Sequence, residues 1–253
     1  MVVQITIITP AHNEENNIEK CILSVKNLSV PNGIELGHVV VLDRCTDNTG
    51  VICKKYNVQT LEKNWRGNYI NLIAEAVEFG VKNTISDYIG KVDADVKLPK
   101  GFITELMPYF DDETVSVSCN IKTRTGKKWL DFFMWIRDLN YKIAPFGIEA
   151  RGGARLINRK LLKEIGSFDR DKPTWDTAFD QKARKQGFKI KNVSTVTAIE
   201  FRRLTVYEII RHQISSGRAR RALGVGFFRT LLHAIFRGRP FVLWGYLSKG
   251  VNK

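Results

Sequence analysis

Apolar residues in the first half of the chain gather in short runs, separated by stretches in which they recur at helical spacing. A short apolar run rich in β-branched residues predicts a strand that is buried on both faces. Such runs, in part interrupted by single polar residues, cover residues 2–9, 38–42, 88–92 and 115–121, and residues 58–61 are a candidate for a further strand. Between them, apolar residues lie three or four positions apart, as from Ile18 to Leu28, which predicts helices that cover the sheet. This alternation indicates an α/β fold with a mostly parallel central sheet.

The second half of the chain has a less regular pattern. Helical spacing is visible over residues 127–141, 175–185 and 205–213, and a strand-like run at residues 155–157 follows a pair of glycines. In residues 226–237 the apolar side chains form one stripe, with arginine beside it. Such a stripe predicts an amphipathic helix, which either lies in a membrane interface or packs on the domain or against a second copy.

Positive charge is concentrated at the end of the chain. The net charge is +14, and the segment from Phe201 to Lys253 holds nine arginines and two lysines against one acid, Glu208, which is +10 of that total. A basic segment on a balanced body is typical of a surface that meets anionic lipid headgroups, phosphates or nucleic acid.

The cysteines and the hydropathy pattern bear on the compartment. Cys21, Cys45, Cys53 and Cys119 form no CxxC pair and no cluster with histidine, so we expect free thiols in a reducing compartment. The first residues lack the basic region of a signal peptide, and the apolar stretches are shorter than the roughly 20 residues that a membrane-spanning helix needs. We therefore expect a cytoplasmic protein that is peripheral on the inner face of the cell membrane.

Polar residues directly follow three of the predicted buried strands. Residues 10–15 follow the first strand, Asp43 ends the second, and Asp93-Ala94-Asp95 follows the fourth. Ligands of parallel α/β sheets bind beyond the carboxyl ends of the strands, so these residues are candidates for one site. Local roles are the alternative: Asp43 can cap the turn after it, and acids such as Glu14 and Glu15 favour a helix start.

The two aspartates after the fourth strand suggest a metal site. In an extended segment, side chains two positions apart point to the same side, so Asp93 and Asp95 would face one point. Carboxylate oxygens suit Mn²⁺ or Mg²⁺, with substrate phosphates and water completing the shell. Such a cation neutralises a diphosphate leaving group. The same pair also occurs by chance in many surface loops.

Several segments, in order, resemble the family 2 glycosyltransferases. They are Thr9-Pro10-Ala11-His12-Asn13-Glu14-Glu15, residues 41–49, Arg66 to Asn71, Val92 to Asp95, residues 152–169, and Trp175-Asp176 followed by Arg184 and Gly187. The resemblance implies a GT-A-type nucleotide-sugar-binding fold and inverting transfer of one sugar from a nucleoside-diphosphate sugar. It also implies a glycosyltransferase domain over residues 1–220, with a nucleotide-binding half (1–122), an acceptor half (123–220) and a basic amphipathic tail (221–253).

The resemblance also assigns roles to individual residues. The nucleotide sugar would meet Pro10, Ala11, Glu14, Asp43, Arg66 and Asp93, with Asp43 at the base and Arg66 near the diphosphate. The metal, Mn²⁺ or Mg²⁺, would be held by Asp95, Asp93 and His212, and Arg218 would meet the diphosphate. Asp176 would be the general base, and Gly152, Gly153 and Trp175 would lie on the acceptor side.

Departures from the family pattern leave alternatives open. Trp175 replaces the usual glutamate before the base, and Asp180 lies one helical turn beyond Asp176 as an alternative base. Arg44-Cys45 replaces a small polar pair, so the nucleotide could be UDP or GDP. An isolated histidine on a helix, such as His212, is more often a surface or packing residue than a ligand.

Two other function classes compete with this interpretation. A sugar-phosphate nucleotidyltransferase would begin with a glycine-rich phosphate loop, which the segment after the first strand does not contain. A nucleic-acid-binding protein could use the basic tail, but no RNA-binding or zinc module is recognisable, so we expect no nucleic acid partner. The expected partners are the donor, a sugar or lipid-linked acceptor, and a membrane surface contacted through the tail.

Overall fold

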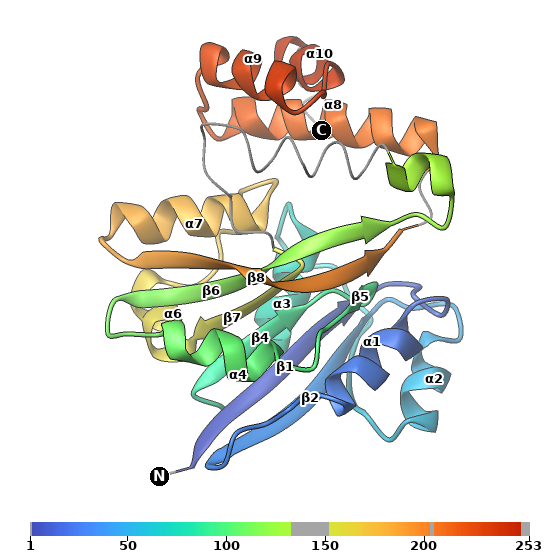
Figure 1. The fold of residues 1–253 in the computed structure, drawn as a ribbon, viewed down its shortest axis with the longest axis vertical. Helices are drawn as coiled ribbons and strands as arrows, with labels where there is room; N and C mark the ends of the chain where they lie inside the picture. Colours follow the sequence, from blue (N-terminus) through green and yellow to red (C-terminus); the bar gives the residue numbers. More distant parts are fainter. Residues whose placement is uncertain (1, 133–151, 203–204, 249–253) are drawn as a thin grey trace. The chain divides into compact units, whose positions relative to one another are not determined.

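The computed structural model describes residues 2–132, 152–202 and 205–248, which belong to two compact units (Figure 1). The first unit comprises Met1–Lys122, Ala150–Asp171 and Trp175–Phe201, and the second comprises Thr123–Glu149, Lys172–Thr174 and Arg202–Lys253. The domain boundary expected at residue 220 stays a prediction.

The first unit is built around one mixed β-sheet. Its strands are β1 (Val3–Ala11), β2 (Ile34–Asp43), β3 (Gln59–Lys63), β4 (Tyr88–Val92), β5 (Val96–Lys97), β6 (Thr114–Arg124), β7 (Ala154–Asn158) and β8 (Lys189–Phe201). Among the described residues their order across the sheet is β3-β2-β1-β4-β7-β6-β8-β5. The expected apolar runs thus correspond to β1, β2, β3, β4 and β6.

Helices cover both faces of the sheet. They are α1 (Ile18–Lys26), α2 (Thr49–Lys55), α3 (Leu72–Lys82), α4 (Phe102–Leu106), the 3₁₀ turn η1 (Met107–Tyr109), α6 (Arg159–Ile165) and α7 (Trp175–Lys185). Ile5 and Ile7 of β1 face a core shared with α1 and α4, whereas Ile8 faces a second core shared with α3, α6 and α7. The α/β fold class is therefore confirmed.

The direction of the strands differs from the expectation of a mostly parallel sheet. β3, β2, β1 and β4 are parallel neighbours, but β7 is antiparallel to both β4 and β6, and β5 is antiparallel to β8. The sheet is therefore mixed. The parallel strand β4 and the antiparallel strand β7 are both buried along nearly their whole length, so the apolar pattern does not distinguish their directions.

The second unit contains α8 (Val206–Ala222), α9 (Phe227–Phe236) and α10 (Phe241–Leu247). Thr205 begins α8 with a capping box, in which its hydroxyl accepts from the Glu208 amide at 3.2 Å and the Glu208 carboxylate accepts from the Thr205 amide at 2.6 Å. Gly217 and Gly245 let the backbones of α8 and α10 touch, because a β-carbon at Gly217 would lie 2.0 Å from the Val242 oxygen.

The helices expected near residues 205–213 and 226–237 are thus present. Of the helix expected over 127–141, residues 133–141 lie outside the described part of the chain, as do residues 249–253 of the tail. Within the described residues, no helix is both long enough and apolar enough to cross a membrane.

Candidate active site

The carboxyl ends of β1, β2 and β4 meet at one edge of the sheet. Ala11 aligns with Leu42, and Ile8 aligns with Lys91, so the residues that follow each strand emerge together. Pro10 and Ala11 are the buried last residues of β1. The first three polar segments predicted from the sequence therefore belong to the same edge.

The loops after β1 and β2 hold each other in place. Asn13 takes a left-handed conformation (φ 56°), and its side-chain Oδ1 accepts from the Thr46 amide at 2.8 Å. The Glu14 amide donates to the Thr49 hydroxyl at 2.8 Å, and its carboxylate accepts from the Asn17 side chain at 3.0 Å. Glu14 thus orders the loop before α1, which begins only at Ile18, so neither Glu14 nor Glu15 is in the first helical turn.

Asp43 is buried among cations at the end of β2. Arg44 donates to both its carboxylate oxygens, at 2.9 and 2.8 Å, and Lys63 donates to one of them at 3.0 Å. Burial would raise the pKa of Asp43, but the hydrogen bonds from Arg44 and Lys63 outweigh it and hold this pKa below its usual value. At neutral pH Asp43 is therefore a carboxylate that already accepts hydrogen bonds from two cations.

Lys63 extends this network into the core. Its ammonium is fully buried, lies 2.8 Å from a Glu75 carboxylate oxygen, and donates to the Trp65 carbonyl at 2.7 Å. Gly67 packs so closely on Glu75 that a β-carbon there would lie 2.2 Å from its carboxylate. Arg66, which the sequence places near a diphosphate, lies exposed on the loop between Trp65 and Gly67.

Asp93 and Asp95 follow β4 in a turn, which corrects the extended geometry assumed from the sequence. The Val96 amide donates to the Asp93 carbonyl at 3.0 Å and closes the turn. Asp93 is tied to the loop before β7, because its amide donates to the Gly153 carbonyl at 2.9 Å. Lys91 makes an ion pair with its carboxylate. The Asp95 carbonyl accepts from the Phe201 amide at 2.8 Å.

The residues at this turn fit a divalent cation by their chemistry. Within the described part of the chain, no three histidine, cysteine or acidic residues form a ready-made metal cluster. Mg²⁺ is commonly held by only one or two carboxylates, with substrate phosphates and water supplying the remaining oxygens. Asp93 and Asp95 are both only half-buried, so the pair fits a cation that binds together with a diphosphate.

Asp176 lies in the first turn of α7, against the glycine loop. A β-carbon at Gly152 would lie 2.8 Å from one Asp176 carboxylate oxygen, and the other oxygen accepts from the Thr177 amide at 2.8 Å. At Gly153 a β-carbon would lie 3.2 Å from an Asp93 carboxylate oxygen. The glycine loop is therefore in contact with both Asp93 and Asp176.

Asp180 and Trp175 have different surroundings. Asp180 is buried and accepts from Arg155 at 2.8 Å; burial raises its pKa, and Arg155 opposes that shift. Its carboxylate is thus engaged in the core, whereas Asp176 is half-exposed. Trp175 is 5% exposed and packs edge-on against Phe168. Its acceptor-side role stays a prediction.

His212 and Arg218 belong to α8 of the second unit. The His212 Nδ1 lies 3.3 Å from an Arg239 nitrogen, and Arg218 donates to the Ser248 hydroxyl at 3.3 Å. Their metal and diphosphate roles stay predictions. Sequence reasoning did not single out Lys63, Lys91 or Arg155; the signal available was a basic residue inside or at the end of an otherwise apolar strand.

Comparison with known proteins identifies the family. The profile named Glycosyl transferase family 2 matches residues 6–167, which is more than half of the chain. The chain belongs to this family. Membership disfavours the sugar-phosphate nucleotidyltransferase considered from the sequence.

Two curated relatives share parts of the sequence. Glycosyltransferase GlyA of Streptococcus pneumoniae is 33% identical over 107 residues, which cover 41% of this chain and 14% of the relative. An uncharacterized glycosyltransferase of Synechocystis, sll0501, is 25% identical over 173 residues, covering 65% of this chain and 53% of the relative. The chain thus spans about half or less of the length of these curated relatives.

Solved structures show that the fold is of the GT-A type. The mannosyltransferase PcManGT from Pyrobaculum calidifontis, in complex with GDP-Man and Mn²⁺, superposes with a TM-score of 0.68 at 19% identity, covering 97% of this chain and 73% of that one. Glucosyl-3-phosphoglycerate synthase from Mycobacterium tuberculosis, with Mn²⁺, UDP and phosphoglyceric acid, gives 0.61 at 17%, covering 94% and 80%. TarS from S. aureus, with UDP-GlcNAc, gives 0.62 at 16%, covering 94% and 72%.

Proposed function

We propose that the protein is an inverting glycosyltransferase that moves one sugar from a nucleoside-diphosphate sugar to an acceptor hydroxyl, with Mn²⁺ or Mg²⁺. The observation that carries the proposal is the glycine loop of residues 152–153, which contacts both Asp93 and Asp176. The donor-side carboxylate and the candidate base are thereby joined within one unit. The similar structures with GDP-Man, UDP or UDP-GlcNAc support UDP or GDP as the donor nucleotide.

In this mechanism Asp176 takes the proton of the acceptor hydroxyl. The freed oxygen bonds to the anomeric carbon on the face opposite the diphosphate, and the bond between that carbon and the diphosphate breaks, so the configuration inverts. Asp93 and Asp95 would hold the divalent cation, which when bound neutralises charge on the diphosphate. Arg66 would meet the diphosphate.

The base of the nucleotide would lie at the loops that follow β1 and β2. Pro10 and Ala11 end β1, Glu14 lies in the loop that follows, and Asp43 ends β2. Because Arg44 donates to both oxygens of Asp43, a base placed there meets a paired carboxylate and guanidinium. Such a pair offers both acceptors and donors, which is compatible with uracil or guanine.

Nucleotide binding tests the donor side of this proposal. We expect one nucleoside diphosphate to raise the melting temperature only when Mn²⁺ is present, because ligands of the folded state stabilise it by about 2.7 kcal/mol at a hundredfold excess over Kd. Asp95→Ala should abolish this shift. Asp112→Ala removes an exposed acid from another loop and should leave it unchanged. The absence of a shift with any nucleotide would contradict the proposal.

The base is tested separately. Asp176→Asn keeps the size of the side chain but cannot accept a proton, so transfer should fall by about a hundredfold or more. Metal-dependent nucleotide binding should persist in this variant. Asp180→Asn is the comparison: if it, and not Asp176→Asn, stopped transfer while the protein stayed folded, the base would be Asp180.

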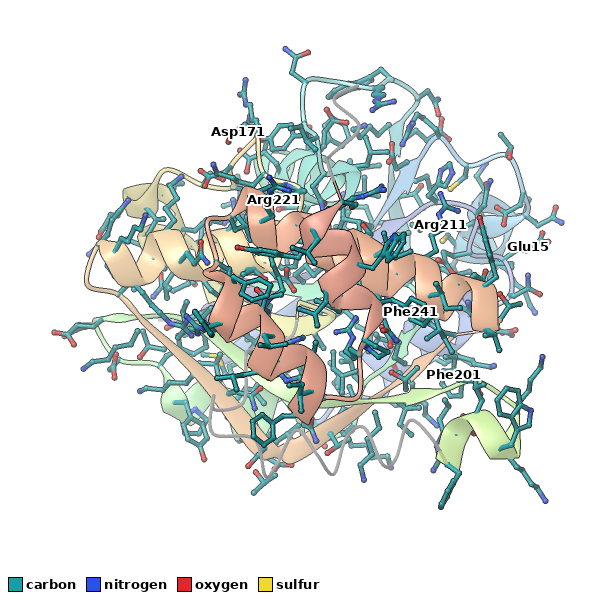
Figure 2. All side chains as sticks on the ribbon, turned by 90° about the horizontal axis from the view of Figure 1, so that it is seen from above. Glu15, Asp171, Phe201, Arg211, Arg221 and Phe241 are labelled. Atoms are coloured by element: carbon teal, nitrogen blue, oxygen red, sulfur yellow. The ribbon has the colours of Figure 1, made fainter. Side chains whose placement is uncertain are left out.

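We also propose that the acceptor is lipid-linked and that the protein works at the membrane surface. The C-terminal helices support this, because apolar side chains of α9 and α10 are exposed to solvent. Phe228 is 77% exposed, Trp244 70% and Ile235 63%. From residue 209 onward the sequence contains no acidic residue. Figure 2 shows these helices with Arg211, Arg221 and Phe241 labelled. Exposed aromatic residues beside arginine suit an anionic lipid surface.

Vesicle flotation tests this surface. The protein should float with vesicles that contain phosphatidylglycerol, less so at high salt, and little with pure phosphatidylcholine. Replacing both Phe228 and Trp244 by glutamate should abolish flotation and leave nucleotide binding intact. Ile85→Glu makes the same change at a 91% exposed position of the first unit and serves as control. Equal flotation of the double variant would contradict the proposal, and salt-sensitive retention on DNA without lipid binding would favour a nucleic-acid partner.

A further inference from the structure

The first unit buries two cations on neighbouring strands that the proposed mechanism leaves unexplained. Lys91 of β4 and Arg155 of β7 are direct partners in the antiparallel register, and they are 1% and 0% exposed. Directly opposed residues project to the same face of a sheet, where like charges destabilise it. The packing of the core by itself therefore gives no reason for a cation at both positions.

The ring of Trp175 and two carboxylates accommodate these cations. The Lys91 ammonium lies 4.8 Å from the ring centroid of Trp175, and the Arg155 guanidinium lies 5.1 Å from it. Arg155 pairs with Asp180 at 2.8 Å, within the core. Lys91 pairs instead with Asp93, whose side chain is 20% exposed. Of these two ion pairs, the one between Lys91 and Asp93 includes a residue of the proposed donor site.

Lys91 also connects that carboxylate to the glycine loop. Its ammonium donates to the Gly152 carbonyl at 2.7 Å. The Asp93 amide donates to the next carbonyl of the loop, that of Gly153, at 2.9 Å. Asp93 is therefore held by its side chain and by its backbone against the loop that contacts Asp176. Since breaking a buried ion pair is costly, the position of Asp93 is strongly defined.

The charge of Lys91 has a second consequence for the same carboxylate. It cancels one of the two negative charges that Asp93 and Asp95 bring to a cation. The Lys91 ammonium repels a divalent cation bound at these aspartates. At a separation of roughly 6 Å this repulsion lowers the affinity for the cation about tenfold, even at the dielectric constant of water. A diphosphate adds negative charge of its own and offsets that loss.

We propose that Lys91 is a positioning residue that fixes Asp93 on the glycine loop and makes cation binding depend on the nucleotide. This inference rests on the proposed function, because it takes Asp93 and Asp95 as the carboxylates that hold the cation. In the wild-type protein, Mn²⁺ binds weakly alone and tightly together with a nucleoside diphosphate. Removal of the lysine charge lets Mn²⁺ bind alone.

The experiment is a titration with Mn²⁺ followed by electron paramagnetic resonance, without and then with nucleoside diphosphate. Lys91→Met removes charge and hydrogen bonds, and Lys91→Gln removes the charge but keeps a donor for the Gly152 carbonyl. Both should bind Mn²⁺ alone about tenfold more tightly than wild type. The factor by which nucleotide strengthens Mn²⁺ binding should shrink correspondingly. Lys122→Met makes the same change at an exposed position of β6 and should match wild type.

The outcomes separate this inference from the proposed function. A purely structural lysine would give variants with equal or weaker Mn²⁺ binding, and that result in a folded variant overturns the inference. If Lys91→Met does not fold, Lys91→Gln decides by the same comparison. If wild type binds no nucleotide with Mn²⁺, the proposed function fails, while the titration with Mn²⁺ alone still measures the effect of Lys91.

Discussion

Replacement of Gly152 by alanine should slow sugar transfer, because the loop has no room for a methyl group. The backbone of Gly152 is outside the left-handed region, so the change brings no conformational strain. The added carbon would lie 2.8 Å from an Asp176 oxygen and 2.9 Å from a carbon of Trp175. Ordinary contacts begin near 3.4 Å, so one group must move by about half an ångström. Trp175 is buried and packs against both Lys91 and Arg155, which leaves Asp176 or the loop to move.

The size of the effect follows from that displacement. A misplacement of a reacting group by 1 Å can slow a reaction about a hundredfold, so a displacement of about half an ångström should slow sugar transfer about tenfold. Overpacking of a buried position should also lower the free energy of unfolding by about 1–2 kcal/mol. The assay compares the release of nucleoside diphosphate from the donor with metal-dependent nucleotide binding, which should persist. Gly37→Ala is the control, because its nearest neighbours would lie at 3.7 and 3.9 Å.

A Gly152→Ala protein that turns over within twofold of wild type and melts at the same temperature would contradict this prediction. Such a result would mean that the loop does not contact Asp176 in solution. A drop in stability without a drop in turnover would mean that the contact exists but does not position the base.

Three other predictions concern the remainder of the chain. Burial alone would raise the pKa of Asp43, but the hydrogen bonds from Arg44 and Lys63 have the larger effect, so the net pKa is lowered. The Asp43 carboxylate therefore stabilises the fold above pH 4, and this stabilisation is lost as the pH falls through the lowered pKa. Asp43→Asn should therefore cost about 3 kcal/mol in urea unfolding at pH 7, and the difference from wild type should shrink below pH 4. Gly217→Ala should separate α8 from α10 and lower the free energy of unfolding by about 2 kcal/mol, which thermal melting and protease digestion would detect. Gly226→Ala, where a β-carbon would meet no atom within 4 Å, should leave stability unchanged. Iodoacetamide at pH 8 should label half-buried Cys45 before the three buried cysteines, since burial raises the pKa of Cys21 and Cys119 to about 12. Mass spectrometry measures the order of labelling, and early labelling of Cys21 would contradict this prediction.

The sequence predicts the first half of the fold well, because most of its strands are short segments rich in β-branched and other apolar residues. β1, β2 and β4 all coincide with such runs, and the polar residues after them meet at one edge. The direction of β7 was not predictable, since a strand buried on both faces has the same composition whether it is parallel or antiparallel. The start of α8 at Thr205 was predictable from its capping residues.

The candidate site was predicted in outline, and its supporting charges were not. Asp93, Asp95 and Asp176 stand out because acids follow a strand or begin a helix. Lys91 does not, because its partner Gly152 lies 61 residues away and nothing local marks a lysine in a strand as buried. The turn at Asp93 was not predictable for a similar reason. The Asp93 amide donates its hydrogen bond to the carbonyl of Gly153, which is distant in the sequence.

The pairing of β4 with β7 also has a consequence for how the chain acquires its structure during synthesis. When residues 1–122 have left the ribosome, β1 to β5 and all but the last two residues of β6 are present, but the carbonyl of Gly152 and the ring of Trp175 are not yet available to Lys91. An ammonium in that position has to stay hydrated until they arrive. The nascent first half therefore cannot close its core early, and a fragment that ends at residue 122 should remain a chaperone client rather than an independently stable domain.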